Sequence, residues 1–576
     1  MSGIAAIFNR DGAPADRAEI ERILSALAHR GPDGRGIWCE GPVALGHAAL
    51  HTTPESSQEH QPLYDETGGL CLILDGRVDN RAELAAALRE NHSGPHDDTD
   101  AAMVLAAYRC WSEAAPARIV GDFAFVIWDG DRRRLFCARD CVGMKPFYYC
   151  CDGRGFICGS EIGALLAVPR VPREPNEAVV ADYLTDRHRS RTQTLFKHLM
   201  RLEAGHCLIV DERGITTRRY YDLAPGRELR YARDDQYAEH FFAIFKEAVR
   251  VRLRSSGAVG CYLSGGLDSS SIIGMAQTLY RDGTMPRARF ETYSMLLPPP
   301  ADEREFINEV VRRWGLSSNT PAPCVPDQSF LIDQVRRFHA LPETPNAIVM
   351  SPLRQLAQAQ GVRVMLDGIG GDDWLQGTRS YCADLIAGLR LAALAKRLRV
   401  QVNQARIYGV PFSPWRELLG NGIKPLLPSA LSAALSRARG REPSVPWIDA
   451  GLMRRSGSLE PSLPSQSGPP GGSFAWRELH EVFVDPFAAL VHESEDRTAA
   501  WCGFEARSPF FDRRLIEFCC ALPEDQRRTV VTKVVLRNAM RGLLPETVRT
   551  RLTKAEFSAP FFNALRAPGI PELFAT

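Results

Sequence analysis

A string rich in glycine and serine follows a short apolar segment near the middle of the chain. After residues 259–263 comes the run Ser264-Gly265-Gly266-Leu267-Asp268-Ser269-Ser270, and a helical pattern follows it. Glycines let a backbone approach a ligand closely, and the amides at a helix amino terminus point at anions. Asp268 suits a phosphate site only if a cation lies between its carboxylate and the phosphate. The string therefore predicts a phosphate-binding turn with a divalent metal, although it lacks the GxxxxGK[ST] pattern of a Walker A loop.

A second glycine-rich loop carries two further carboxylates. It follows the apolar residues 362–366 and reads Asp367-Gly368-Ile369-Gly370-Gly371-Asp372-Asp373. Loops at the carboxyl ends of parallel strands meet at one edge of the sheet, so we expect Asp372 to face Asp268. Taken alone, Asp372 could equally be a helix N-cap. With Asp268 opposite, the pair predicts a site for one or two hard cations such as Mg²⁺.

The elements around these loops alternate between short apolar strands and helices. We expect strands at 259–263, 290–297 and 362–366, and helices at 236–254, 269–280 and 303–314. This strand–helix–strand order predicts a parallel sheet with crossover helices. Further helices are expected over 381–442, where Leu385, Leu389 and Ala393 share one face that should point to the core.

The first 220 residues have a different rhythm, with short strands separated by Asp-Gly pairs. Turns are expected at Asp75-Gly76, Asp129-Gly130 and Asp152-Gly153. Helical segments intervene at 19–28 and 101–111. This pattern predicts antiparallel sheets with helices packed on their outer faces.

The composition excludes several classes of protein. The chain has 576 residues, of which 45% are hydrophobic and 24% charged, and its 70 Lys+Arg balance 69 Asp+Glu. Such a balance argues against a general electrostatic grip on nucleic acid. Fifteen cysteines occur without a CxxC pair, which is typical of reduced thiols in a cytosolic enzyme. No signal peptide and no membrane span are expected, and the predicted location is cytoplasmic.

Taken together, these strings resemble the asparagine synthetase family. The turn at Ser264, the loop at Asp372 and the run from Gly503 to Asp512 resemble its synthetase half, whereas Ala28-His29-Arg30-Gly31-Pro32-Asp33 and Gly121-Asp122-Phe123-Ala124 resemble its glutaminase half. The resemblance implies an α+β Ntn-hydrolase-like domain over residues 1–220. An α/β ATP-pyrophosphatase domain with a parallel sheet and helical carboxy-terminal additions would follow over 235–576.

The resemblance also implies a reaction. ATP adenylates a carboxylate, pyrophosphate leaves with Mg²⁺, and a nitrogen nucleophile displaces AMP. ATP and Mg²⁺ are therefore the expected cofactors. The implied metal ligands are Asp268 and Asp372, and Lys554 is the implied catalytic lysine. The residues implied to hold ATP or pyrophosphate are Ser264, Gly265, Gly266, Asp268, Ser269 and Lys533, with Arg537 nearby.

The glutaminase half departs from the family at its functional positions. The nucleophilic cysteine of the family is replaced by Ser2, and the arginine that holds the substrate carboxylate by Ala49. The family's Asn-Gly-Glu string reads Asp75-Gly76-Arg77. Serine can serve as an Ntn nucleophile in principle, but this pocket lacks the groups that recognise glutamine. The sequence therefore predicts a structural domain without glutaminase activity.

If glutamine is not used, several readings remain open. The favoured one is a lasso peptide cyclase, which closes a macrolactam by an isopeptide bond between a peptide's amino terminus and an Asp or Glu side chain. A β-lactam-type synthetase, an asparagine synthetase using free ammonia and a non-catalytic peptide- or nucleotide-binding scaffold are the alternatives. Where the family has Glu or Tyr this chain has Ile369, so any general base lies elsewhere. Glu493, Glu495 and Asp496 are candidates that the sequence does not rank.

The partners expected from this reading are peptides and proteins. The substrate would be a precursor peptide, and a leader-peptide-binding protein or leader peptidase the partner protein. Residues 381–442 hold ten Lys+Arg against three Asp+Glu, a local charge of +7. This stretch could hold an acidic peptide or a partner protein. A solvated helical face is the alternative.

Overall fold

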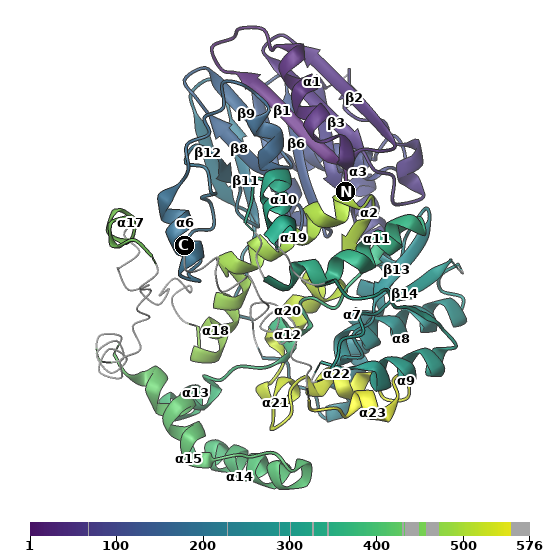
Figure 1. Ribbon diagram of the computed structural model, residues 1–576, viewed down its shortest axis with the longest axis vertical. Helices are drawn as coiled ribbons and strands as arrows, with labels where there is room; N and C mark the ends of the chain where they lie inside the picture. Colours follow the sequence, from purple (N-terminus) through teal and green to yellow (C-terminus); the bar gives the residue numbers. More distant parts are fainter. Residues whose placement is uncertain are drawn as a thin grey trace.

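The computed structural model has two halves, with two antiparallel sheets above and a parallel sheet below (Figure 1). It describes residues 1–66, 68–226, 228–286, 288–299, 301–324, 328–341, 345–428, 431, 448–456 and 472–553. In this part of the chain no helix is both long enough and apolar enough to cross a membrane.

The amino-terminal half contains two six-stranded sheets whose neighbouring strands pair antiparallel. The strand order of the first sheet is β10 (Met200–Arg201), β8 (Tyr148–Cys151), β9 (Gly155–Gly159), β1 (Gly3–Asn9), β3 (Val43–Ala49) and β2 (Gly34–Glu40). The order of the second is β12 (Ile215–Arg219), β11 (His206–Val210), β7 (Arg134–Arg139), β6 (Phe123–Asp129), β5 (Leu70–Gly76) and β4 (Leu63–Asp65).

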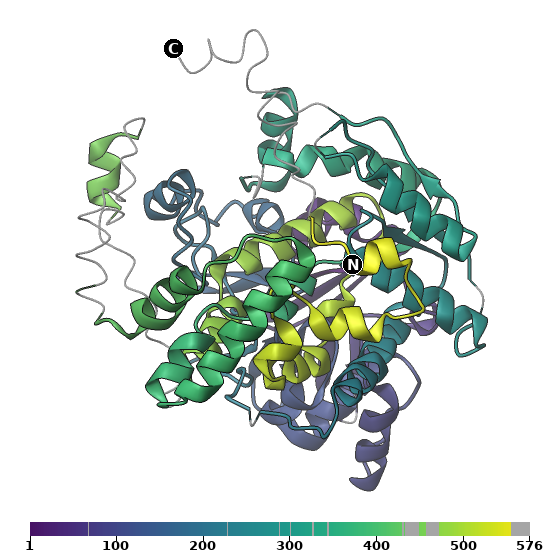
Figure 2. The same cartoon turned by 90° about the horizontal axis from the view of Figure 1, so that it is seen from below.

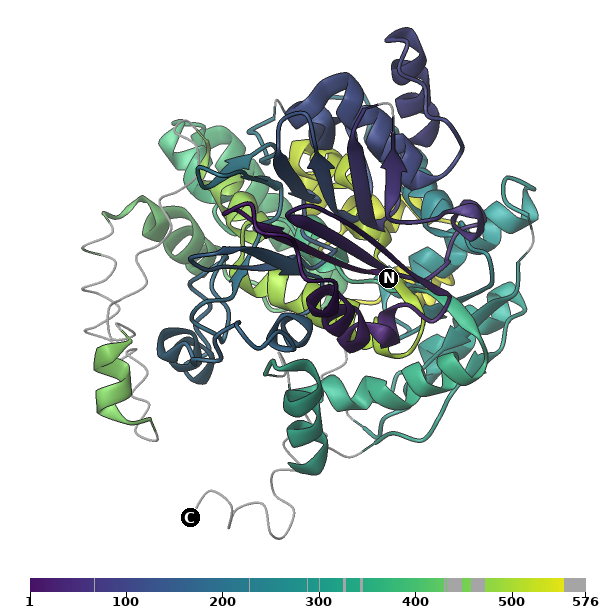
Figure 3. The same cartoon turned by 90° about the horizontal axis from the view of Figure 1, so that it is seen from above.

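The two sheets face each other across an apolar layer that includes Phe8, Val126 and Leu208. Helices α1 (Arg17–Ala26) and α5 (Ile162–Leu166) cover the outer face of the first sheet, and α2 (Arg81–Glu90) and α3 (Asp100–Trp111) that of the second. Figure 3 shows the sheets between these helices. The inner strands β1, β3, β5 and β6 are buried on both faces, which accounts for their apolar residues on both sides. The predicted α+β Ntn-hydrolase-like domain is confirmed.

Two of the three expected Asp-Gly turns are confirmed, and the third is wrong. Asp129-Gly130 joins β6 to β7, and Asp152-Gly153 joins β8 to β9. Asp75 and Gly76 instead continue β5 and pair with Ala124 and Phe123. A Cβ at Gly76 would lie 2.6 Å from the Asp122 carbonyl oxygen, so glycine serves close strand approach there.

The carboxy-terminal half is built on a five-stranded sheet whose strands are all parallel. Their order is β15 (Ser318–Asn319), β14 (Phe290–Tyr293), β13 (Ala258–Tyr262), β16 (Val362–Leu366) and β17 (Glu505–Arg507). One face packs on α7 (Asp234–Arg252), α8 (Leu267–Arg281) and α9 (Arg304–Trp314), and the other on α11 (Ser351–Ala359) and α19 (Pro486–Trp501). The expected parallel sheet with crossover helices is confirmed, and helices cover both of its faces.

Additional helices lie beside this sheet. In Figure 2, α20 (Arg513–Ala521), α22 (Val534–Ala539) and α23 (Glu546–Arg549), in yellow, lie between α8 and α9 and the green helices α13 (Tyr381–Ala387) and α14 (Leu391–Tyr408). Leu385 is buried as expected. The prediction for Leu389 was wrong, because α13 ends at Ala387 and Leu389 is 82% exposed. Residues 429–430 and 432–442 of the basic stretch lie outside the described residues.

Buried charged side chains join the two halves. We call Arg30, Asp75, Arg77, Lys145, Asp496 and Glu505 the charge cluster, and each is at most 4% exposed. An Arg77 Nη1 to Glu505 Oε1 contact of 3.2 Å and an Arg30 Nη2 to Asp496 Oδ1 contact of 2.5 Å cross between the halves. Burial opposes ionisation of Glu505, but Arg507 and Lys145 outweigh it and hold its pKa well below the ordinary value. Glu505 is therefore a carboxylate anion within this cluster.

Replacing Arg77 by Met is expected to lower the free energy of unfolding by about 3 kcal/mol or more, because it leaves buried carboxylates without their cation. Chemical denaturation of the full chain measures the change. The control is Arg218→Met, which removes an ion pair with Glu113 from a side chain that is 62% exposed, and it should cost at most about 1 kcal/mol. Equal unfolding midpoints for the two variants would show that the charge cluster does not hold the halves together.

Candidate functional site

A cavity of about 540 Å³ lies at the carboxyl ends of β13 and β16. The turn after β13, the loop after β16, the start of α22 and residues 551–553 all line it. Six of the residues predicted to hold phosphate or metal are among its lining residues: Ser264, Gly266, Asp268, Ser269, Asp372 and Lys533. We call this space the reaction cavity.

The first turn is shaped by its glycines and serines. Helix α8 begins at Leu267, directly after Gly266, so its amino terminus opens into the reaction cavity. Gly265 has a φ of +72°, and a Cβ there would lie 2.9 Å from the Phe306 Cβ. The hydroxyls of Ser264 and Ser269 lie 3.1 Å apart. Free amides at a helix amino terminus with neighbouring hydroxyl groups can bind phosphate oxygens.

The second loop packs directly on the first. A Cβ at Gly371 would lie 2.5 Å from the Asp268 Cγ, and one at Gly368 would lie 3.1 Å from the Ser269 backbone nitrogen. Side chains at either position would push the loops apart. These glycines therefore let the backbone reach Asp268 and bring Asp372 to the same space.

Lys533 lies between the two carboxylates. Its Nζ is 2.6 Å from Asp372 Oδ1 and also contacts Asp268. Lys533 is the residue immediately before α22, and its backbone is left-handed there, with a φ of +60°. The two aspartates thus form one anionic site that already attracts a cation.

The same pair of carboxylates fits Mg²⁺. Within the described ranges no third His, Cys, Asp or Glu joins them in a metal-binding group. Mg²⁺ is usually held by one or two carboxylates, with water and substrate phosphates completing its shell. Asp268 and Asp372 are therefore the residues that would hold the ion beside the phosphates.

Lys554 lies outside the described residues, so its predicted role stays a prediction. Arg551, three residues earlier, lines the reaction cavity and makes a 2.6 Å ion pair with Glu303. It also donates to the Gly265 carbonyl at 3.4 Å. Sequence reasoning missed Arg551 and Glu303, because no spacing links residues 248 positions apart.

The structure separates the three candidate bases on α19. Glu493 is buried and accepts from Arg201 at 2.5 Å; burial opposes its ionisation, but Arg201 and Arg139 hold its pKa below the ordinary value. Asp496 belongs to the charge cluster. Glu495 alone of the three lines the reaction cavity, with 29% of its side chain exposed and Arg354 Nη2 at 2.7 Å.

Two further residues of the second loop border the same cavity. Ile369 has no proton to exchange. Asp367, which sequence reasoning did not single out, is 4% exposed. Its burial is the main cause, and repulsion from Glu495 a further cause, of a rise in its pKa to about 7. A carboxyl with that pKa can hold or release a proton near neutral pH.

Two of the residues at which the amino-terminal half differs from the expected glutaminase pattern, Asp75 and Arg77, belong to the charge cluster. Asp75 pairs with Arg30, with Oδ2 and Nη2 3.3 Å apart. Arg77 binds Asp79 through two nitrogens, at 2.9 and 3.0 Å. The Ser2 hydroxyl accepts from the Leu50 amide at 3.2 Å, and its carbonyl accepts from Arg30 at 3.0 Å. These polar groups are engaged with one another.

In comparisons with known proteins, the amino-terminal and carboxy-terminal halves match two different protein families. Residues 1–221 match the model of the glutamine amidotransferase domain, and residues 240–575 match that of asparagine synthase. Amidase chry2 of Gibberella zeae is 30% identical over 70% of this chain and 68% of its own length. Asparagine synthetase [glutamine-hydrolyzing] 3 of Bacillus subtilis is 25% identical over 93% and 83%. Amidase chyE of Penicillium rubens is 26% identical over 93% and 84%.

Proposed function

This chain belongs to the asparagine synthase family of ATP-dependent carbon–nitrogen ligases, which form AMP and pyrophosphate, and we propose that it joins the amine and a side-chain carboxylate of one peptide. The product would be a macrolactam closed by an isopeptide bond, as in a lasso peptide cyclase. The observation that carries this proposal is the charge cluster, which takes up the positions where the glutaminase half would recognise glutamine.

Without the arginine that would hold the carboxylate of glutamine, the nitrogen of the new amide bond must come from another source than glutamine. Ala49 is a small side chain in β3 that offers no cation to a substrate carboxylate. Arg77 is 1% exposed and bound to Asp79, Asp122 and Glu505, so it supports the interface between the halves. An amine already present on the substrate needs no glutaminase, and the domain then serves to complete the fold around the reaction cavity.

The first chemical step would be adenylation of the carboxylate. A carboxylate oxygen attacks the α-phosphorus of ATP, the bond to the β-phosphate oxygen breaks, and pyrophosphate leaves with the electron pair. The helix amino terminus at Gly266 and the Ser264 and Ser269 hydroxyls would bind the departing phosphates, while Lys533 balances their charge. Mg²⁺ held by Asp268 and Asp372 would supply further neutralisation of phosphate charge.

The second step would be attack by the amine. The nitrogen lone pair forms the C–N bond, the acyl C–O bond breaks, and AMP leaves with the electron pair. One proton must leave the attacking nitrogen, and Glu495 is the cavity-lining carboxylate of α19 that could accept it. Arg354 would hold that carboxylate in place.

The direct experiment is a screen of synthetic peptides with ATP and Mg²⁺. Each peptide carries a free amino terminus and one Asp or Glu, placed at different distances along the chain. The expected product has lost one water, and AMP appears in equal amount. The matched control is the same peptide with an acetylated amino terminus, which can be adenylated but cannot close. A linear product whose side-chain carboxyl has become an amide, by gain of ammonia and loss of one water, would favour an asparagine synthetase instead.

Glutamine should play no part in this reaction. Ser2→Ala is expected to leave peptide closure unchanged, because among the described residues the one hydrogen bond of the Ser2 hydroxyl is accepted from the Leu50 amide. Glutamate release from glutamine, measured with and without ATP and peptide, should stay at background for the parent protein and the variant. Glutamate formed in proportion to AMP would overturn the cyclase proposal in favour of an amidotransferase.

A further inference from the structure

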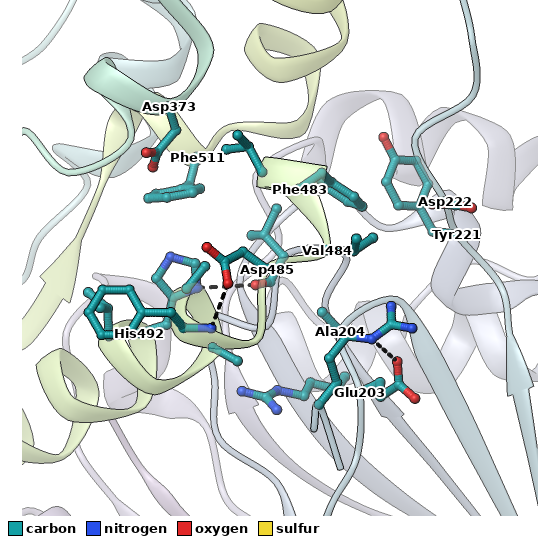
Figure 4. Close-up of a pocket in the computed structure, with 18 of the residues that line it drawn as sticks. Glu203, Ala204, Tyr221, Asp222, Asp373, Phe483, Val484, Asp485, His492 and Phe511 are labelled. Atoms are coloured by element: carbon teal, nitrogen blue, oxygen red, sulfur yellow. Dashed lines mark hydrogen bonds and ion pairs between the residues drawn. The ribbon is translucent and has the colours of Figure 1, made fainter. Parts of the chain in front are cut away.

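A second cavity, of about 240 Å³, lies between the two halves, and we call it the interdomain pocket (Figure 4). The amino-terminal half contributes Ala204 and Tyr221 to its wall. Phe483 and Asp485 come from the segment around the start of α19, and Phe511 from the segment that follows β17. Neither half alone makes this pocket.

The interdomain pocket adjoins the reaction cavity. Ile369 and Asp373 line both spaces, so part of the second glycine-rich loop forms a wall that the two spaces share. A molecule bound in the interdomain pocket near Ile369 and Asp373 would therefore hold a reactive group next to the reaction cavity, where the carboxylate is activated. Reacting groups held this close react as if at very high concentration.

The interior of the pocket is apolar. Phe483, Phe511 and Val484 face it (Figure 4), and Trp374, whose ring packs against those of Phe483 and Phe511, is 2% exposed. Burial lowers the pKa of His492 to about 4, so this ring is neutral at pH 7. Such a lining favours an aliphatic or aromatic side chain over a charged one.

The charges around the pocket leave a negative balance at its rim. Its four arginines each have a carboxylate partner: Arg191 pairs with Glu203, Arg219 with Asp222, and Arg139 and Arg201 with Glu493. By contrast, no Lys, Arg or His nitrogen among the described residues lies within 4 Å of the carboxylate of Asp373 or Asp485, and both residues are exposed.

Asp485 can still accept a ligand. Its Oδ1 caps α19 by accepting from the Phe487 amide at 3.0 Å. In the described part of the chain, its Oδ2 accepts no hydrogen bond. A carboxylate with one oxygen fixed and the other open is a well-oriented acceptor for an ammonium group.

We propose that the interdomain pocket binds the amine component of the ligation, with its ammonium group at Asp373 and Asp485 and the apolar side chain of the same residue inside. This inference rests on the proposed function, and it names the amine as the terminus of a peptide whose first residue is bulky and apolar. The ammonium loses a proton to water at the exposed rim before the neutral amine attacks.

The test uses L-phenylalanine amide as the probe and titration calorimetry on the full chain without ATP. At about pH 6.5 the amine is protonated. N-acetyl-L-phenylalanine amide lacks the charge and glycinamide lacks the side chain, so both should bind at least about tenfold more weakly. No measurable binding of L-phenylalanine amide, or equal affinity for the acetylated form, would overturn the proposal.

Two variants locate the binding. Asp485→Asn keeps an oxygen for the Phe487 amide but removes the charge. It should weaken the binding of L-phenylalanine amide about tenfold. Ala204→Phe fills the pocket from the amino-terminal half and should abolish binding. Unchanged affinity in both variants, with normal thermal melting, would place the probe elsewhere.

The result is separable from the proposed function. Because ATP is absent, loss of adenylation cannot abolish probe binding. A protein that binds the probe but never forms AMP with any peptide would contradict the ligase proposal alone. A protein that forms AMP and cyclic peptide but does not bind the probe would contradict the pocket assignment alone.

Discussion

Asp372→Ala is expected to lower AMP and pyrophosphate formation by about a thousandfold while leaving the thermal melting temperature unchanged. Asp372 shares the Lys533 ammonium with Asp268 at the edge of the reaction cavity, and 36% of its side chain is exposed. Losing it removes half of the anionic site that would hold Mg²⁺ against the phosphates, but little packing. Asp268→Ala should behave in the same way, because both carboxylates act on the same cation.

The matched control for these variants is Asp282→Ala. Asp282 lies just beyond the other end of α8 and pairs with Lys246 on the surface. It should melt and turn over like the parent protein. Chelation of divalent metal should reduce the parent to the level of Asp372→Ala, with recovery on adding Mg²⁺. Substantial AMP formation by either cavity variant would mean that the two carboxylates do not share the metal.

Glu495→Gln is expected to lower kcat for amide closure by about a hundredfold while leaving adenylation nearly intact. The amide keeps an oxygen for Arg354 but cannot take a proton from the amine. Exchange of labelled pyrophosphate into ATP reports adenylation, and cyclic product reports closure, so the two steps can be measured on one protein. The closure step should therefore respond to the variant and the exchange should not.

The control is Glu481→Gln, an exposed carboxylate on α18 (Phe474–Phe483) that does not line the reaction cavity. It should close peptide at the parental rate. A fall in pyrophosphate exchange equal to the fall in closure would assign Glu495 to carboxylate binding. Unchanged closure would remove it from the reaction and turn attention to Asp367, which lines the same cavity and whose raised pKa of about 7 lets it change its protonation at neutral pH.

The order of strands and helices and the meeting of the two glycine-rich loops could be predicted from the sequence. Apolar strands followed by helices constrain a parallel sheet strongly, and such a sheet gathers its loops at one edge. The Asp75-Gly76 turn was wrong because Asp-Gly is a local preference, whereas pairing with β6 is a tertiary interaction. Local signals do not report which strand lies alongside.

Ranking the carboxylates of α19 was beyond the sequence for a related reason. Glu493, Glu495 and Asp496 lie within one turn of the same helix. All three carry a carboxyl group, and the sequence does not show what surrounds each of them. They differ because α19 lies between the two halves: Glu493 and Asp496 meet arginines of the amino-terminal half, while Glu495 faces the reaction cavity. Only the docking of the halves distinguishes them.

The left-handed backbone of Lys533 has a consequence for attempts to engineer this enzyme. A side chain in that conformation costs about 1 kcal/mol relative to glycine. Lys533→Gly would remove that backbone cost, but it would also leave the Asp268 and Asp372 carboxylates facing each other without the ammonium between them. The cation that this site needs is therefore carried by a residue whose own side chain disfavours the backbone conformation that places it there.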